Sequence, residues 1–219
     1  KFRPVLEAVV ELECGVTGQG SAPTGTSVGS HEAAVIRDHN RNSFCGLSVF
    51  HAIEHVNTTI DSALKGMDVL DQQGIDQKMI ELDGTSNKSR LGGNAIYSVS
   101  IACLKAAAEV QQKSLYQLVA GKELKTIPLP TANSIIGGKY PDQKVCFQEF
   151  TFCPYRAKDI TEAMEIIYHV HHMIGEIFSR EMGGQPALIG NSHGWQPPTE
   201  DPEVIMELLE EAVDNCGYR

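Results

Sequence analysis

Acidic and imidazole side chains recur at helical spacing in the second half of this sequence. Glu165, His169 and His172 stand at positions i, i+4 and i+7, which places them on one face of a helix. A carboxylate and two imidazoles can bind a transition metal. The alternative is a polar helix face with its imidazoles in water, and we favour it because no ligand from a second element can be named.

A single carboxylate, that of Glu149, stands beside Gln148 in the otherwise apolar stretch Val145–Phe150. Alternation and composition predict a strand here. A buried carboxylate at this position needs hydrogen-bond or charge partners, because its desolvation is costly. The alternative is a glutamate at a strand end that faces solvent, which is where most glutamates lie.

The overall composition excludes some classes of protein. The 219 residues carry a formal net charge of -10, and the 18 basic residues are scattered, which argues against nucleic-acid binding. No apolar stretch approaches the length of a membrane span. The six cysteines show no C-x-x-C spacing, so we expect reduced thiols in the cytosol.

The elements that would position these side chains fall into two groups. In the first group we expect a strand over residues 5–14, a flexible loop or linker over 15–30, and a run of helices. The second group reads as two strands followed by two helices, with a domain boundary near residue 126. The expected helices cover residues 46–65, 75–82, 92–113, 115–120, 160–177 and 202–216, and the later strands cover 134–136 and 145–153.

Four segments resemble the enolase family. Leu82–Ile96 is similar to the enolase segment L-D-G-T-x-N-K-x-x-L-G-A-N-A-I, which is long and specific. The similarity needs few gaps over the whole chain. The other three segments are Thr24–Ala33, similar to the S-G-A-S-T-G-x-H-E-A loop, Gly137–Phe150, similar to N-G-G-S-H followed by Q-E-F, and Ile189–Pro197, similar to G-D-E-G-G-x-A-P.

This resemblance implies a fold and an activity. The fold would be an α+β amino-terminal domain, residues 1–126, followed by the ββαα start of an enolase-type α/β barrel, residues 127–219. The activity would be the Mg2+-dependent interconversion of 2-phosphoglycerate and phosphoenolpyruvate in glycolysis, performed by a homodimer. The main metal ligands and the lysine base of the family would lie beyond Arg219, so we expect the chain to be part of a longer one. We expect residues 1–219 by themselves not to fold as a compact monomer.

The resemblance also assigns roles to single residues. Glu149 takes the place of the glutamate beside the leaving hydroxyl. Ser27 takes the place of the loop serine that closes onto a second Mg2+, and its hydroxyl oxygen is a hard ligand that suits this ion. Val28 replaces a family threonine next to it, which changes the closure of the loop.

Two family positions on the acid side are altered. Tyr140 stands where the family has a substrate-contacting histidine, and tyrosine carries no positive charge near neutral pH. Asn191 and Ser192 stand where the family has Asp-Glu, and a serine hydroxyl cannot replace a carboxylic acid as proton donor. His193 follows directly, but its side chain is aimed differently from that of its neighbour.

Two hypotheses remain open. The first is an enolase-family protein with weak or lost activity and a partly structural role, either as a homodimer or within a larger assembly. The second is a fully active Mg2+-dependent phosphopyruvate hydratase. The divergence resembles that of the testis-type group of animal enolases, which is associated with the sperm flagellum, so the resemblance implies a cytoplasmic, flagellar or cytoskeletal location.

Overall fold

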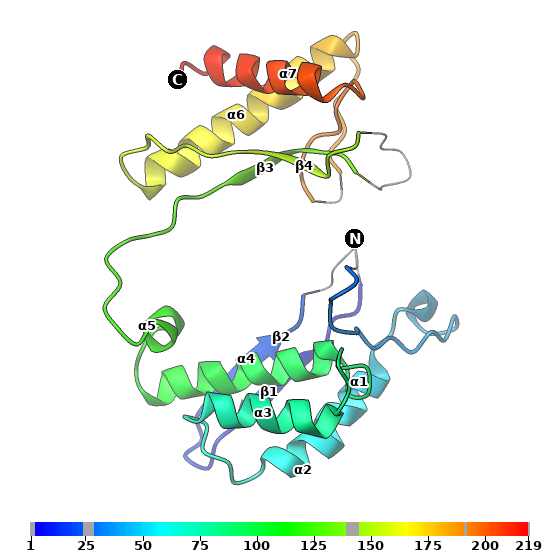
Figure 1. The fold of residues 1–219 in the computed structure, drawn as a ribbon, viewed down its shortest axis with the longest axis vertical. Coiled ribbons are helices and arrows are strands. Elements are labelled where there is room, and N and C mark those ends of the chain that lie inside the picture. Colours follow the sequence, from blue (N-terminus) through cyan, green and yellow to red (C-terminus); the bar gives the residue numbers. More distant parts are fainter. Residues whose placement is uncertain (1–2, 24–28, 139–144, 191, 219) are drawn as a thin grey trace. The chain divides into compact units, whose positions relative to one another are not determined.

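The computed structural model describes residues 3–23, 29–138, 145–190 and 192–218. The chain forms two compact units, Lys1–Leu124 and Lys125–Arg219, and each has a hydrophobic core of its own. Figure 1 shows a hairpin with helices in the first unit, and a hairpin with two long helices in the second. Each unit is described by itself below.

The first unit is built on a β-hairpin of the strands β1 (Glu7–Glu11) and β2 (Thr17–Ser21), which run antiparallel. The prediction of a flexible loop over residues 15–30 is therefore wrong for β2. Its glycines allow close packing: a Cβ atom on Gly18 would lie 2.1 Å from the carbonyl oxygen of Ala102, in helix α4. Composition alone does not separate glycines that pack closely from glycines of a linker.

Helices cover this hairpin and carry most of the first core. A single turn of π-helix, Val56–Ile60, joins the first two, so the helix expected over residues 46–65 runs with this interruption from Phe50 to Leu64. The small, apolar character of α4 predicts burial on several sides, and this is confirmed by ten buried residues along it. The helices are α1 (Phe50–His55), α2 (Asp61–Leu64), α3 (Gln72–Asp83), α4 (Gly93–Val110) and α5 (Leu115–Ala120).

The second unit has the expected order of two strands and two helices. β3 (Ala132–Ile136) pairs antiparallel with β4 (Glu149–Phe152). The helices α6 (Ile160–Glu181) and α7 (Pro202–Asn215) follow. The described residues of this unit form a two-stranded sheet with two helices and do not close into a barrel.

Local chemistry starts and joins the two long helices. Asp159 accepts a hydrogen bond from the amide of Glu162 at 2.9 Å, and Asp201 caps α7 in front of Pro202. The guanidinium of Arg180 in α6 reaches both carboxylate oxygens of Glu211 in α7, at 2.5 and 2.9 Å. This bidentate pair joins the two helices at the surface, beside their apolar contact.

Candidate functional site

Segments that are distant in the sequence meet at the carboxyl end of β3. The last residue of this strand, Ile136, lies opposite Glu149 of β4. On its other side, the amide of Ile136 donates to the carbonyl oxygen of Trp195 at 3.0 Å. Glu149 and the segment before Trp195 therefore flank the same strand end, and Figure 1 shows the segment before α7 reaching this end of the hairpin.

Two glycines shape the exit from β3. The amide of Gly137 donates to the carbonyl oxygen of Gln148 at 2.8 Å, and that of Gly138 to the carbonyl oxygen of Val145 at 2.9 Å. A Cβ atom on Gly137 would lie 2.3 Å from the carbonyl oxygen of Phe147, so only glycine fits there. Tyr140, which takes the place of the family histidine, lies outside the described residues.

Glu149 is the first residue of β4 and its side chain is exposed. The strand begins here, later than the expected start at Val145, because residues 145–148 form the bend that meets Gly137 and Gly138. Val145 and Phe150 are buried on either side of the bend. The carboxylate of Glu149 is therefore held at a fixed strand end with access to solvent.

Ser192 and His193 lie between Gly190 and Gly194, whose backbones approach each other. Asn191, which precedes Ser192, lies outside the described residues. The amide of Gly190 donates to the carbonyl oxygen of Gly194 at 2.9 Å. The hydroxyl oxygen of Ser192 is buried and has no hydrogen-bond partner among the described residues. The side chain of His193 is exposed, and its backbone takes a left-handed φ of 67°.

The histidines of helix α6 have partners other than a metal. Nδ1 of His169 lies 2.8 Å from the hydroxyl oxygen of Tyr218. Nε2 of His172 lies 3.3 Å from a carboxylate oxygen of Glu176, and its ring stacks with that of Tyr168. Within the described ranges, no group of three or more His, Cys, Asp or Glu side chains could hold a metal ion.

In the first unit, the segment that follows residues 24–28 is tied to the start of helix α4. Ser27, the proposed metal ligand, lies outside the described residues. The amide of Ala34 donates to the carbonyl oxygen of Asn87 at 2.7 Å. The side chain of Asn94 accepts from the amide of Ile36 at 3.1 Å and donates to its carbonyl oxygen at 3.3 Å. The side-chain amide of Asn94 thus bonds both backbone groups of Ile36, as a neighbouring strand would. The motif alone did not reveal this role.

Asp83 performs a similar task within the most specific motif of the sequence. Its carboxylate accepts from the amides of Thr85, Arg90 and Leu91 at 3.0, 3.0 and 2.6 Å, and from the hydroxyl of Thr85. Burial raises the pKa of Asp83, but these hydrogen bonds outweigh it and the pKa is lowered. The segment Leu82–Ile96 is therefore held together by a buried carboxylate.

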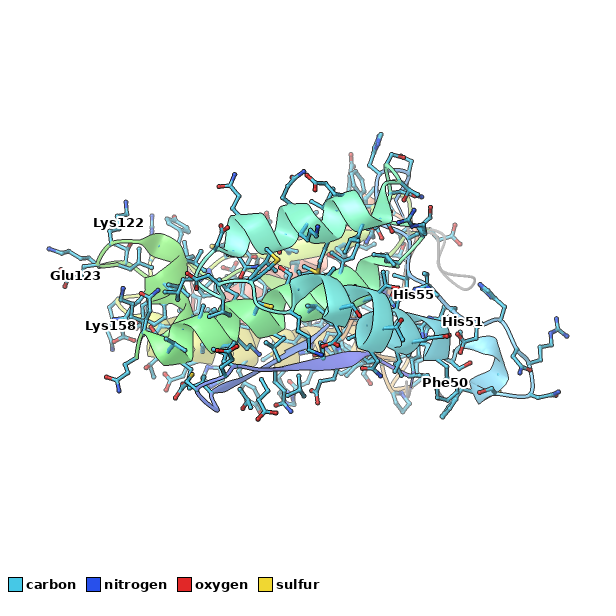
Figure 2. All side chains as sticks on the ribbon, turned by 90° about the horizontal axis from the view of Figure 1, so that it is seen from below. Phe50, His51, His55, Lys122, Glu123 and Lys158 are labelled. Carbon is cyan, nitrogen blue, oxygen red and sulfur yellow. The ribbon has the colours of Figure 1, made fainter. Side chains whose placement is uncertain are left out.

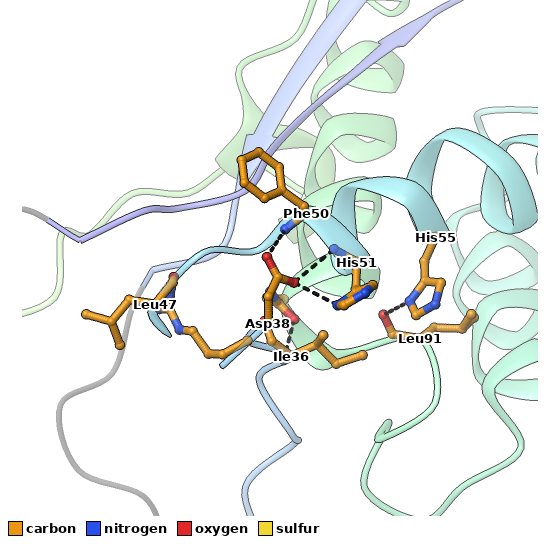
Figure 3. A network of polar contacts seen from close by, with 9 residues as sticks. Ile36, Asp38, Leu47, Phe50, His51, His55 and Leu91 are labelled. Atoms are coloured by element: carbon orange, nitrogen blue, oxygen red, sulfur yellow. Dashed lines mark hydrogen bonds and ion pairs between the residues drawn. The ribbon is translucent and has the colours of Figure 1, made fainter. Parts of the chain in front are cut away.

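Asp38 holds the start of helix α1 from outside the helix. Figure 2 shows Phe50 and His51 at this end of α1. The carboxylate accepts from the amides of Phe50 and His51 at 2.9 and 3.0 Å, and it pairs with Nδ1 of His51 at 2.9 Å, as Figure 3 shows. Burial raises the pKa of Asp38, but the nearby hydroxyl of Ser48 and the hydrogen bonds from the two amides lower it to about 2.

Comparison with protein families gives two matches along the chain. Residues 2–119 match the model of the enolase N-terminal domain, and residues 124–219 match that of the enolase C-terminal TIM barrel domain. Together they span nearly all of the 219 residues. The helices within the described ranges are all too short or too polar to cross a membrane.

Proposed function

Because this chain belongs to the enolase family, we propose that it is an enolase-like protein whose acid-side chemistry is weakened or lost. The family reaction removes a proton next to a carboxylate and then expels the β-hydroxyl as water. An acid must help this hydroxyl to leave. Ser192 stands at the position of that acid, and its enclosed hydroxyl is the observation that carries the proposal.

A serine in this place is too weak an acid for this role. Its hydroxyl has no pKa near neutrality, so it does not deliver a proton to the leaving group at an appreciable rate. Burial of the oxygen adds a second obstacle, because a substrate in solvent does not reach it. The loss of a general acid typically slows a reaction by about two to four orders of magnitude.

The other candidate residues have roles that follow from their chemistry. We assign Glu149 to the side of the leaving hydroxyl, where its exposed carboxylate can accept or donate a hydrogen bond. Tyr140 takes the substrate-contacting position, where it can hydrogen-bond but cannot supply the positive charge of a histidine. The change to Tyr140 removes a positive charge, and together with the change at Ser192 it weakens the binding of a charged transition state.

Enolases generally depend on Mg2+, which stabilises the charge that develops on the substrate. Ser27 offers a hard oxygen ligand, but it lies outside the described residues. The described side chains include no group of three or more acidic, histidine or cysteine residues that could complete such a centre. We therefore assign no reaction step to a bound ion.

An active phosphopyruvate hydratase is the second candidate function. It is favoured by the exposed imidazole of His193, next to the altered position. Histidine is the side chain whose ordinary pKa suits proton transfer near neutral pH. In this case His193 would replace the missing carboxylic acid.

Turnover of 2-phosphoglycerate by the full-length protein with Mg2+, including the family's metal ligands and lysine base expected beyond Arg219, separates the two candidates. We expect a rate at least about 100-fold below that of an ordinary enolase, and we expect the double substitution Asn191→Asp with Ser192→Glu to raise it. Gln196→Glu, which adds a carboxylate just outside the turn, serves as the control. A rate within about tenfold of an ordinary enolase that is lost in His193→Gln would establish the second candidate instead.

The proposals for oligomeric state and location in the cell rest on the family and on the resemblance to the testis-type group. We propose a homodimer, or a subunit of a larger assembly, which acts in the cytoplasm and, through the testis-type resemblance, in the sperm flagellum. We also propose that residues 1–126 and 127–219 are its two domains. Light scattering measures the oligomeric state, and localisation of the tagged protein in sperm cells tests the flagellar role.

A further inference from the structure

The single tryptophan of the chain connects the turn Gly190–Gly194 to helix α6. The indole N–H of Trp195 donates to the carbonyl oxygen of His171 at 2.7 Å. The ring lies directly over Gly175, one helical turn further along. A Cβ atom on Gly175 would lie 2.5 Å from Cζ2 and 2.8 Å from Cε2 of this ring, so no other residue leaves room for the indole.

His171 contacts the same turn a second time through its side chain. Its Nε2 lies 3.0 Å from the carbonyl oxygen of His193. Because a carbonyl oxygen only accepts, Nε2 carries the proton of this hydrogen bond. The rings of His171 and Trp195 are also in contact, with centroids 5.4 Å apart. One helical residue thus holds the turn through its backbone and through its imidazole.

The conformation of the turn needs such support. His193 has a φ of 67°, a left-handed conformation that a residue with a Cβ atom disfavours. The backbone of Trp195 is already fixed on β3, since its amide donates to the carbonyl oxygen of Ser134 at 2.9 Å. The position of the indole and of the His193 carbonyl therefore determines the orientation of Ser192 and His193.

We propose that Trp195, His171 and Gly175 form a latch that holds this turn with the hydroxyl of Ser192 enclosed and the imidazole of His193 exposed. Trp195 and His171 are then positioning residues for Ser192, which stands at the acid position. Gly175 leaves the space that the indole occupies. The latch depends on the proposed function only for the role of Ser192. Its geometry can be tested without any turnover.

The first test is a double-mutant cycle between Gly175 and Trp195. An ordinary Gly→Ala change within a helix raises the melting temperature, here by about 4–8 °C for a unit of this size. The latch predicts the opposite for Gly175→Ala, a fall of about 5 °C or more with altered tryptophan fluorescence. In the Trp195→Phe background, which removes the outer ring and the N–H, the same change should again be stabilising. If Gly175→Ala raises the melting temperature in both backgrounds, the indole of Trp195 does not require a glycine at position 175, and the proposal fails.

The second test measures the positioning itself. Ser192→Cys places a thiol at the enclosed position, and its modification by a thiol reagent is followed by mass spectrometry of the peptide that contains it. We expect modification to be at least about tenfold faster when Gly175→Ala or Trp195→Phe is added, because either change releases the turn. Glu176→Ala, at an exposed neighbour in α6, is the control and should leave the rate unchanged.

The two tests together decide the proposal. If Gly175→Ala does not fold, Trp195→Phe still provides the comparison for the thiol at position 192. Equal modification rates in the latched and released variants would refute the positioning role. A slow turnover of 2-phosphoglycerate by itself bears on the proposed function and not on the latch, so the failure of one is distinguishable from the failure of the other.

Discussion

Replacement of Asp83 by asparagine tests whether the most specific motif of this chain is a structural device. The carboxylate accepts from Thr85 with one oxygen and from the amides of Arg90 and Leu91 with the other. Asparagine has one acceptor oxygen, and its NH2 group must oppose at least one N–H donor. It will place its oxygen on the buried amide of Leu91 and its NH2 group on Thr85.

The magnitude follows from these contacts. An amide of Thr85 left without an acceptor costs about 1–2 kcal/mol, and two hydrogen bonds that change from charged to neutral lose about 1 kcal/mol each. The expected loss is about 3 kcal/mol, a large part of a typical folding stability of about 5–15 kcal/mol. Urea unfolding followed by far-UV circular dichroism measures it.

Asp71→Asn is the matched control for this prediction. Asp71 caps helix α3 and accepts from the amide of Gly74 at 3.0 Å in an exposed place, where asparagine is an equally good cap. The lowered pKa of Asp83 adds a pH signature: its contribution is complete above about pH 4 and fades as the pH falls through its folded-state pKa. Asp83→Asn should lack this acid dependence, and a stability within about 1 kcal/mol of Asp71→Asn would refute the reasoning.

Two further predictions concern side chains that order the first unit. Asp38→Ala should lower its stability by about 1–2 kcal/mol, because two amides at the start of α1 lose their acceptor. Since the pKa of Asp38 is lowered to about 2, this difference should persist down to about pH 4 and vanish towards pH 2 in acid-unfolding experiments. Asn94→Ala should cost about 2 kcal/mol and speed amide hydrogen exchange at Ile36, whereas the exposed Asn57→Ala should do neither.

The sequence was most informative where a motif or a periodic pattern is local. The segment Leu82–Ile96 indicated the enolase family, which the family matches confirm. The apolar stripes of α6 and α7 follow from side-chain spacing alone, and Pro202 marks the start of α7. The strand β2 was missed because Gly18 and Gly20 read as linker residues, and only their contact with α4 shows why glycine is needed.

For the candidate site too, the residue types are known from the sequence, whereas their positions in space come from the fold. The residue types at positions 149 and 192 are a matter of sequence, and the hypothesis that a carboxylic acid is missing on one side rests on them alone. Glu149 reaches the end of β3 by pairing with Ile136 in a hairpin, whereas Ser192 is brought there by a pairing of segments more than fifty residues apart, that of Ile136 with Trp195. No local pattern predicts such pairings, because their free energy comes from contacts that exist only after folding.

The sequence by itself determined the family and the order of most helices and strands. It also motivates the hypothesis that the acid is lost. Only the tertiary structure decided that the hydroxyl of Ser192 is enclosed and the imidazole of His193 exposed. It also revealed why Gly175 lacks a side chain, since the indole of Trp195 occupies that space. The physical reason is that close packing is a property of surfaces brought together by folding, whereas residue type and spacing are properties of the chain.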